Sequence, residues 1–242
     1  EVYFVASAEA EATTFLCSFR VAGMRPRLWM PETGRSVSQP VYDQQNGLTK
    51  MPVRLGPYGS VFVVFEKDSA AERYTAFTRD GVEVSGLLAT TPADLRGKLA
   101  GIAMDGTKLE VARGGLYEAR TASGKRLRAE VAEVPSPVEV TDAWKLEVPK
   151  RQGAPETVAL DRLISWTSHA DDGVQHFSGT AVYRKTIEVA AAQLQPGARL
   201  YLDLGRVEVI AEVKLNGRDL GTLLQPPYRV DITDVRSEEH TS

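Results

Sequence analysis

The chain has 242 residues, of which 43% are hydrophobic and 25% are charged, and its formal net charge is -3. This composition is ordinary for a globular protein and too apolar for wholesale disorder. Basic residues are spread along the chain rather than clustered, which argues against nucleic acid as a partner.

Apolar runs along the chain are short. None reaches the roughly 20 residues that a membrane-spanning helix needs, so the sequence predicts no membrane partner. The length exceeds that of one typical domain and favours one large domain or two modest ones.

The first 67 residues alternate apolar and polar positions in short runs, separated by Gly, Pro, Asn and Asp. This pattern predicts antiparallel strands, and a strand about every ten residues favours a β-sandwich. Asn46-Gly47 lies between two of the runs and predicts a tight hairpin, because both residues tolerate a positive φ. The predicted strands cover residues 2–7, 13–21, 25–30, 48–55 and 60–67.

Residues 68–135 give a weaker signal and are predicted to form an irregular, β-rich connecting segment. The polar stretch at 66–74 is typical of a linker. Residues 93–100 are a candidate for a short helix, since Pro92 costs little at a first helical position. A hairpin is expected around residues 122–125.

A second dense β block is predicted over residues 136–235, with another Asn-Gly turn at Asn216-Gly217. Arg184 lies among apolar neighbours on one of its strands and is expected to pair with Asp203 or Asp231 across a sheet. The predicted strands cover residues 142–148, 180–189, 198–207, 210–217, 218–224 and 228–233.

Three segments of this block carry a resemblance to a known sugar-binding module. They are FSGTAVYRKTIEV, RLYLDLGRVEVIAEVKLNGRDLG and PPYRVDIT. In this order they resemble the galactose-binding-like jelly roll of glycoside hydrolase family 2. The wider layout is similar to the C-terminal region of α-L-rhamnosidases of glycoside hydrolase family 106, through LWMPETG at 28–34, GSVFVVF at 59–65 and SWTSH at 165–169.

The resemblance implies an all-β fold of two antiparallel β-sandwich units, of which the second is a galactose-binding-like jelly roll. Both units are expected to be truncated. Residues 1–67 would belong to an accessory sandwich and residues 136–235 to the sugar-binding sandwich. Residues 236–242, RSEEHTS, look like a translated sequencing adapter and are expected to be a non-native tail.

The resemblance also implies a function. Members of family 106 carry their acid and base carboxylates in an upstream barrel domain, and nothing in this chain corresponds to that barrel. We therefore expect no catalytic residue here, an upstream catalytic barrel as partner, and a parent enzyme that is exported by a bacterium. Its substrate would be a rhamnose-containing glycan with terminal α-L-rhamnosyl linkages.

The connection over residues 165–179 concentrates side chains that suit carbohydrate. Aromatic faces stack on sugar C–H surfaces, and planar polar groups bond to vicinal hydroxyls. The alternative is that the two aromatic residues of this loop close the end of a sandwich core. The candidate substrate-binding residues are Trp166, His169, Asp171, Asp172, His176 and Phe177.

The sequence predicts no cofactor. The spacing of His169 and His176 matches no recognised zinc pattern. A structural calcium ion held by Asp171, Asp172 and loop carbonyl groups is an alternative, because calcium accepts oxygen ligands in flexible geometry. Two further functions stay open at this point: a stand-alone carbohydrate-binding module and a purely structural scaffold between domains.

Overall fold

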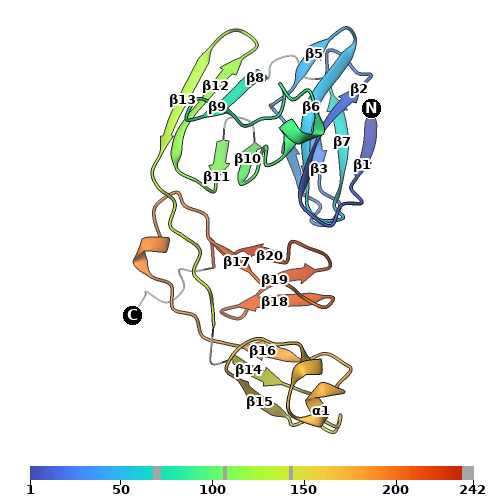
Figure 1. The fold of residues 1–242 in the computed structure, drawn as a ribbon, viewed down its shortest axis with the longest axis vertical. Coiled ribbons are helices and arrows are strands. Elements are labelled where there is room, and N and C mark those ends of the chain that lie inside the picture. The colour runs from blue at the N-terminus through green and yellow to red at the C-terminus, as the bar shows by residue number, and fades with distance from the viewer. Residues whose placement is uncertain (68–71, 106–107, 142–143, 236–242) are drawn as a thin grey trace. The chain divides into compact units, whose positions relative to one another are not determined.

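The computed structural model describes residues 1–67, 72–105, 108–141 and 144–235. The predicted non-native tail at 236–242 lies outside the described residues, as does part of the predicted linker at 66–74. The fold is all-β with antiparallel sheets, which confirms the predicted fold class (Figure 1). The described helices are single turns: η1 Pro92–Leu95, η2 Trp166–Ser168, α1 Asp172–Gln175 and η3 Ala191–Gln193.

Two sheets face each other in the first 67 residues. A four-stranded sheet has the order β1-β7-β3-β4, and a three-stranded sheet has the order β2-β6-β5. Phe19, Met51, Val53, Val63 and Phe65 from both sheets form one buried core, which defines a β-sandwich. The strands are β1 Val2–Ala6, β2 Thr13–Phe19, β3 Arg25–Trp29, β4 Ser36–Ser38, β5 Asp43–Gln45, β6 Leu48–Leu55 and β7 Ser60–Glu66.

Alternation along β7 decides which side chains enter that core. Val61, Val63 and Phe65 are buried, whereas Phe62 between them is 37% exposed. Successive side chains of a strand point to opposite faces, so Val61, Val63 and Phe65 line the core while Phe62 lies on the outer face. Val64 shares that outer face but is only 9% exposed, so the outer face meets solvent in part. The Asn46-Gly47 turn has φ values of 51° and 76°, which confirms the predicted hairpin.

The middle of the chain contains a four-stranded sheet of order β13-β12-β8-β9 and the hairpin β10-β11. The predicted hairpin around residues 122–125 is confirmed, because β12 and β13 pair on either side of it. The predicted helix at 93–100 is reduced to the single turn η1. The strands are β8 Tyr74–Arg79, β9 Val82–Glu83, β10 Ile102–Asp105, β11 Lys108–Val111, β12 Gly115–Thr121 and β13 Arg126–Val131.

The second β block forms three small sheets with the orders β15-β14-β16, β17-β20 and β18-β19. By its contacts the chain divides into two compact units. Residues 1–134 and 199–242 make up unit 1, and residues 135–198 make up unit 2. The domain boundaries and the jelly roll that the sequence suggested stay predictions. The strands are β14 Trp144–Glu147, β15 Thr157–Leu160, β16 Val182–Arg184, β17 Tyr201–Asp203, β18 Ala211–Leu215, β19 Arg218–Leu223 and β20 Arg229–Asp231.

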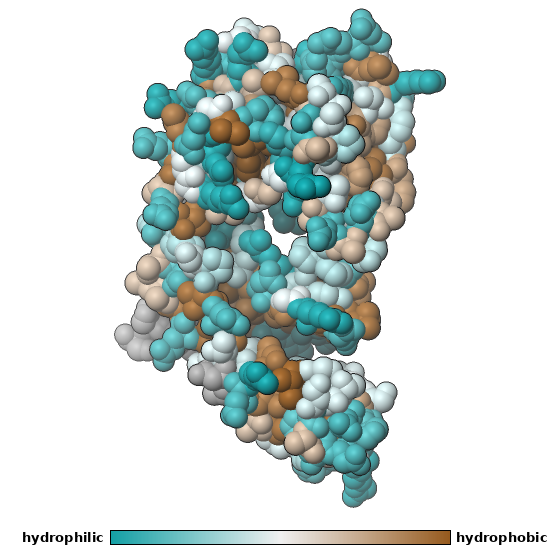
Figure 2. All heavy atoms as spheres, viewed as in Figure 1, coloured by the Kyte–Doolittle hydropathy of each residue, from teal (hydrophilic) through white to brown (hydrophobic). Residues whose placement is uncertain are grey.

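The surface mixes polar and apolar side chains. On the face drawn in Figure 2, hydrophobic groups gather in patches between hydrophilic ones. In the described part of the chain, no helix has the length and apolar character needed to cross a membrane.

Candidate functional site

The loop that joins β15 to β16 in unit 2 contains all six candidate residues. It folds into the two turns η2 and α1. Asp171 begins α1, because its carboxylate accepts a hydrogen bond from the backbone N–H of Val174 at 3.0 Å. An aspartate in this position satisfies a donor that the helix leaves free. Asp171 is therefore a helix cap, and its cap places Val174 in the core of unit 2.

Trp166 and Phe177 meet in an aromatic cluster. Their ring centroids lie 5.3 Å apart in an edge-to-face arrangement. Phe177 is buried with Leu146, and Trp166 is half-buried against the same core. Both rings therefore make packing contacts with the core of unit 2.

Two further aromatic residues join the cluster, and the sequence did not mark them as part of the site. The hydroxyl of Tyr183 accepts a hydrogen bond from Nε1 of Trp166 at 2.5 Å, and the two rings stack with 6.5 Å between centroids. Trp144 contacts Tyr183 edge to face at 6.4 Å. Tyr183 is 38% exposed, so the cluster has an aromatic surface that solvent reaches.

The remaining polar candidates belong to the same loop. Nδ1 of His169 accepts a hydrogen bond from the backbone N–H of Asp171 at 3.0 Å. His176 and Asp172 are exposed, and Nδ1 of His176 lies 3.3 Å from Oδ1 of Asp172. Their side chains therefore have room for a ligand, whereas those of His169 and Asp171 already serve the loop backbone.

A metal site needs several ligand side chains close together. Among the described residues, no three or more His, Cys, Asp or Glu side chains form a group that could hold a metal ion. Of the two residues considered for calcium, Asp171 uses Oδ1 for its cap and Asp172 is exposed.

Arg184 pairs with a different partner from the one predicted. Its Nε lies 2.8 Å from Oε2 of Glu147, and Lys145 reaches the other oxygen of the same carboxylate at 2.8 Å. Antiparallel pairing of β14 with β16 sets Lys145 opposite Arg184, so these side chains share one face of the sheet. Asp231, one of the predicted partners, pairs with Arg199 of unit 1 at 3.0 Å.

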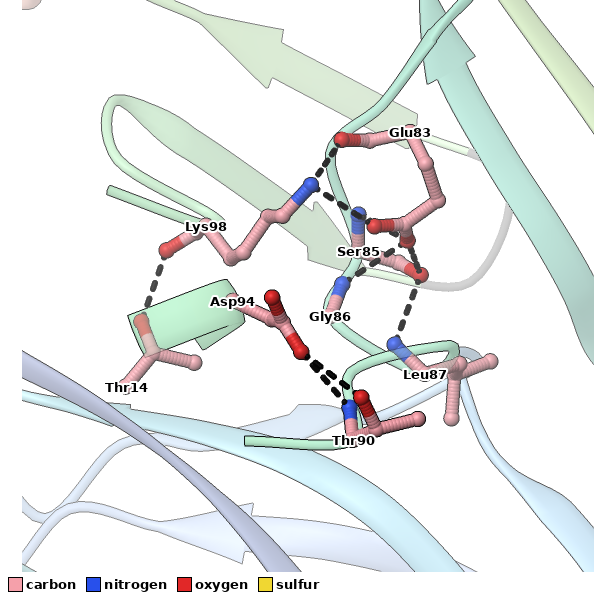
Figure 3. A network of polar contacts seen from close by, with 8 residues as sticks. All are labelled: Thr14, Glu83, Ser85, Gly86, Leu87, Thr90, Asp94 and Lys98. Atoms are coloured by element: carbon pink, nitrogen blue, oxygen red, sulfur yellow. Dashed lines mark hydrogen bonds and ion pairs between the residues drawn. The ribbon is translucent and has the colours of Figure 1, made fainter. Parts of the chain in front are cut away.

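A second polar cluster lies in unit 1, between β9 and the end of the η1 region (Figure 3). The carboxylate of Glu83 accepts hydrogen bonds from the backbone N–H groups of Ser85 and Gly86 at 2.7 and 2.8 Å, and from the Ser85 hydroxyl. Lys98 lies 2.9 Å from its other oxygen. The backbone carbonyl of Lys98 then accepts a hydrogen bond from the Thr14 hydroxyl of β2 at 2.7 Å.

Asp94 completes this cluster as the partner of Thr91 in a capping box at η1. Hydrogen bonds from the backbone N–H groups of Thr90 and Thr91 lower its pKa from 3.8 to about 2. The pKa of Glu83 is also lowered: burial opposes the charged form, but the bonds from Ser85, Lys98 and Gly86 outweigh it. Each of these bonds stays within the cluster. We therefore interpret the cluster of Glu83, Ser85, Asp94 and Lys98 as a latch, which holds residues 83–98 against the sandwich through the bond to Thr14.

The latch predicts a loss of stability in acid. A carboxyl group whose pKa is lowered by folding stabilises the fold above its unfolded pKa, and this contribution disappears as the pH falls through the folded pKa. For Asp94 that window runs from about pH 4 down to about pH 2. We expect Glu83→Gln to cost roughly 1–2 kcal/mol at pH 7, the lower part of the range for bonds to a charged group, because the site is partly exposed.

Urea unfolding at pH 7 and at pH 2.5 measures this effect. The difference between the wild type and Glu83→Gln should shrink at the lower pH, because the contribution of the charged carboxylate is lost as the pH falls through its lowered pKa. Glu130→Gln on β13 is the matched control, since Glu130 is exposed. This substitution should leave the free energy of unfolding unchanged at both pH values. A difference for Glu83→Gln that is the same at both pH values would contradict the latch.

Two comparisons place the chain near carbohydrate-cleaving proteins. The solved structure of the rhamnosidase from Novosphingobium sp. PP1Y matches 97% of this chain with a TM-score of 0.65 and 29% sequence identity. A protein of Formosa agariphila named "Putative beta-glucuronidase" is 40% identical over 127 residues, or 52% of this chain. No family model matches the chain.

The chain is therefore related to glycoside hydrolases, with a β-sandwich fold. It spans only a small part of either protein: 17% of the rhamnosidase chain and 11% of the glucuronidase-named protein.

Proposed function

We propose that this chain is a non-catalytic, accessory part of a glycoside hydrolase that removes terminal α-L-rhamnosyl units from polysaccharides. One observation carries the proposal: nearly the whole chain matches a rhamnosidase, of which it covers only 17%. A chain that occupies so small a share of an enzyme of this kind leaves most of the enzyme to supply the reaction. The chain's own contribution is then to support the catalytic domain and to bind the glycan.

The electrostatics of the carboxyl groups support the non-catalytic role. A glycosidase needs a carboxyl group that keeps its proton near neutral pH, and therefore one with a raised pKa. In the described part of the chain, each carboxyl pKa that departs from its ordinary value is lowered, because hydrogen bonds and cations favour the charged form. These groups are Glu83, Asp94, Glu147 and Asp231.

An exposed aromatic row supports the accessory role. Phe62 on β7 lies opposite Phe4 of β1 and Trp29 of β3, and all three side chains are exposed on the outer face of the sandwich. Exposed apolar surface of this kind marks a contact site. The occupant that we propose is the catalytic domain of the same enzyme. Hydrogen exchange of β1 that is equally fast in the whole enzyme and in the isolated chain would count against this contact.

The unit 2 loop supplies the carbohydrate contact in this proposal. Tyr183 and Trp166 offer stacked rings, and His176 and Asp172 offer exposed polar groups on the same loop as Trp166. A rhamnose-containing glycan would place a C–H face on the rings and its hydroxyl groups on the polar pair. All six candidate residues of the loop belong to this part of the proposal, with Phe177, Asp171 and His169 as supports.

Assaying the purified 242-residue chain for hydrolysis tests the non-catalytic role. With p-nitrophenyl α-L-rhamnopyranoside as substrate, we expect release of nitrophenol no faster than in buffer. The same chain after Glu147→Gln and Asp231→Asn should behave identically. Turnover by the wild type that either substitution abolishes would place a reacting carboxylate in this chain and refute the proposal.

Affinity measurements on the same chain test the loop. We expect weak binding of rhamnose-containing oligosaccharides, with a Kd in the millimolar range, and a loss of at least about fivefold in His176→Ala and in Trp166→Ala, since an aromatic contact is worth about 1 kcal/mol. His176→Ala removes an exposed group and leaves the core intact, so it separates lost binding from lost folding. Binding that neither variant weakens would exclude the loop, and no binding at all would favour a scaffold.

A further inference from the structure

A hollow of about 410 Å³ opens on the surface of unit 1, far in sequence from the unit 2 loop. It lies between the turn at residues 56–59, the loop at residues 205–208 and the side chains of Pro226 and Tyr228. Its volume is within the range of small-molecule sites and suits a single sugar ring.

Tyr58 presents its ring at one wall of the hollow. The side chain is 61% exposed, although it is aromatic. Its backbone has a φ of 52°, a left-handed conformation that costs energy for any residue other than glycine. Its N–H donates to the carbonyl of Glu9 at 2.9 Å, and the N–H of Gly59 donates to the carbonyl of Gly56 at 3.0 Å. These bonds hold the backbone of the turn that carries the Tyr58 side chain at the hollow.

A planar cation and a carboxylate, Arg206 and Glu208, line the same hollow from the loop at residues 205–208. Nη2 and Nε of Arg206 lie 2.6 and 2.7 Å from Oε1 of Glu208, and both side chains are exposed. A guanidinium has five N–H donors, so the pair keeps donors and a carboxylate oxygen for other partners. The buried hydroxyl of Tyr228 donates to the carbonyl of Val209 at 2.7 Å, which anchors the loop that carries the pair.

We propose that this hollow binds one neutral pyranose unit of a polysaccharide. The ring of Tyr58 stacks on a C–H face of the sugar, and Arg206 and Glu208 bond to two neighbouring hydroxyl groups as donor and acceptor. The opposite charges of the pair cancel, so the hollow gives a uronate carboxylate no net attraction. The subsite is separate from the loop of unit 2 and does not depend on that loop binding sugar.

Titration of the ¹⁵N-labelled chain by NMR tests the subsite. The probes are the methyl pyranosides of L-rhamnose, D-galactose and D-glucose, each to about 50 mM, with methyl β-D-glucuronide as the charged comparison. We expect at least one neutral probe to shift the amide signals of Tyr58, Gly59, Gly205 and Arg206, with a Kd in the millimolar range. Shifts of amide signals in unit 2 report sugar binding to the loop. The same titration therefore tests the hollow and the loop separately, and either proposal can be refuted without the other.

Two variants at Tyr58 separate the effect of the ring on sugar binding from any effect on the stability of the fold. Tyr58→Gly removes the ring and relieves the backbone, because glycine accepts a positive φ without cost. It should fold at least as stably as the wild type and bind the neutral probe at least fivefold more weakly. Tyr58→Phe keeps the ring and should bind within about twofold of the wild type. No shift near the hollow with any neutral probe, tighter binding of the glucuronide, or unchanged affinity in Tyr58→Gly would overturn the proposal.

Discussion

Replacing Leu146 with alanine is expected to unfold unit 2 while the sandwich of residues 1–67 stays folded. Leu146 is 1% exposed at the centre of a core that it shares with Val148, Leu160, Val174 and Phe177. A buried Leu→Ala change costs about 2–5 kcal/mol. A unit of this size gains only about 3–5 kcal/mol from its core, so the loss is comparable with its whole stability.

Hydrogen exchange resolved along the sequence measures this outcome. Amides of β14 and β15 should lose their protection in Leu146→Ala, while those of β6 and β7 keep theirs. Leu163→Ala is the matched control, because that side chain is 50% exposed in the same unit and its removal should leave both regions protected. Loss of protection throughout the chain in Leu146→Ala would mean that the two units unfold together.

Replacing Phe65 with alanine should produce the largest loss of stability within the sandwich. The ring is 3% exposed and contacts the rings of Tyr3 and Phe19 at 5.8 and 5.4 Å between centroids. Its removal leaves a cavity between the two sheets, and a buried Phe→Ala change costs about 3–5 kcal/mol. We expect the sandwich to unfold at a markedly lower urea concentration.

Phe62→Ala is the control for this change on the same strand. Phe62 points to the opposite face, and its ring centroid lies 5.0 Å from that of Phe4. The substitution removes this ring contact and should lower the free energy of unfolding by about 1 kcal/mol or less. Urea unfolding followed by circular dichroism gives both values. Equal losses for the two variants would mean that the inward and outward faces of β7 are assigned wrongly.

The strands with clear alternation were predictable because their signal is local. The runs that became β1, β2, β3, β6 and β7 are each within two residues of prediction at either end. Asn46-Gly47 and Asn216-Gly217 both have the positive φ values that the turn requires. By contrast, β8 and β9 were missed, although Asp80-Gly81 between them is the same kind of signal, with φ values of 50° and 77°.

The site was predicted only in part, for a related reason. The composition of residues 165–179 identified the loop, but not the division of its residues between packing and exposure. Tyr183 enters the cluster from β16, and the partner of Arg184 comes from β14, through pairings between segments far apart in the chain. Neither contact can be inferred from the pattern of apolar and polar residues along the chain.

The sequence by itself determined the all-β class and the main strands of the sandwich, because alternation and turn residues act over a few positions. The relation to carbohydrate enzymes came from the resemblance of whole motifs to known families. Only the tertiary structure decided that Phe177 is core, that Asp171 is a cap and that Glu83 and Lys98 form a latch. It also brought Tyr58 and Arg206 to one hollow. These roles depend on which distant backbone segments lie together, and that is set by the burial of the whole chain's apolar surface.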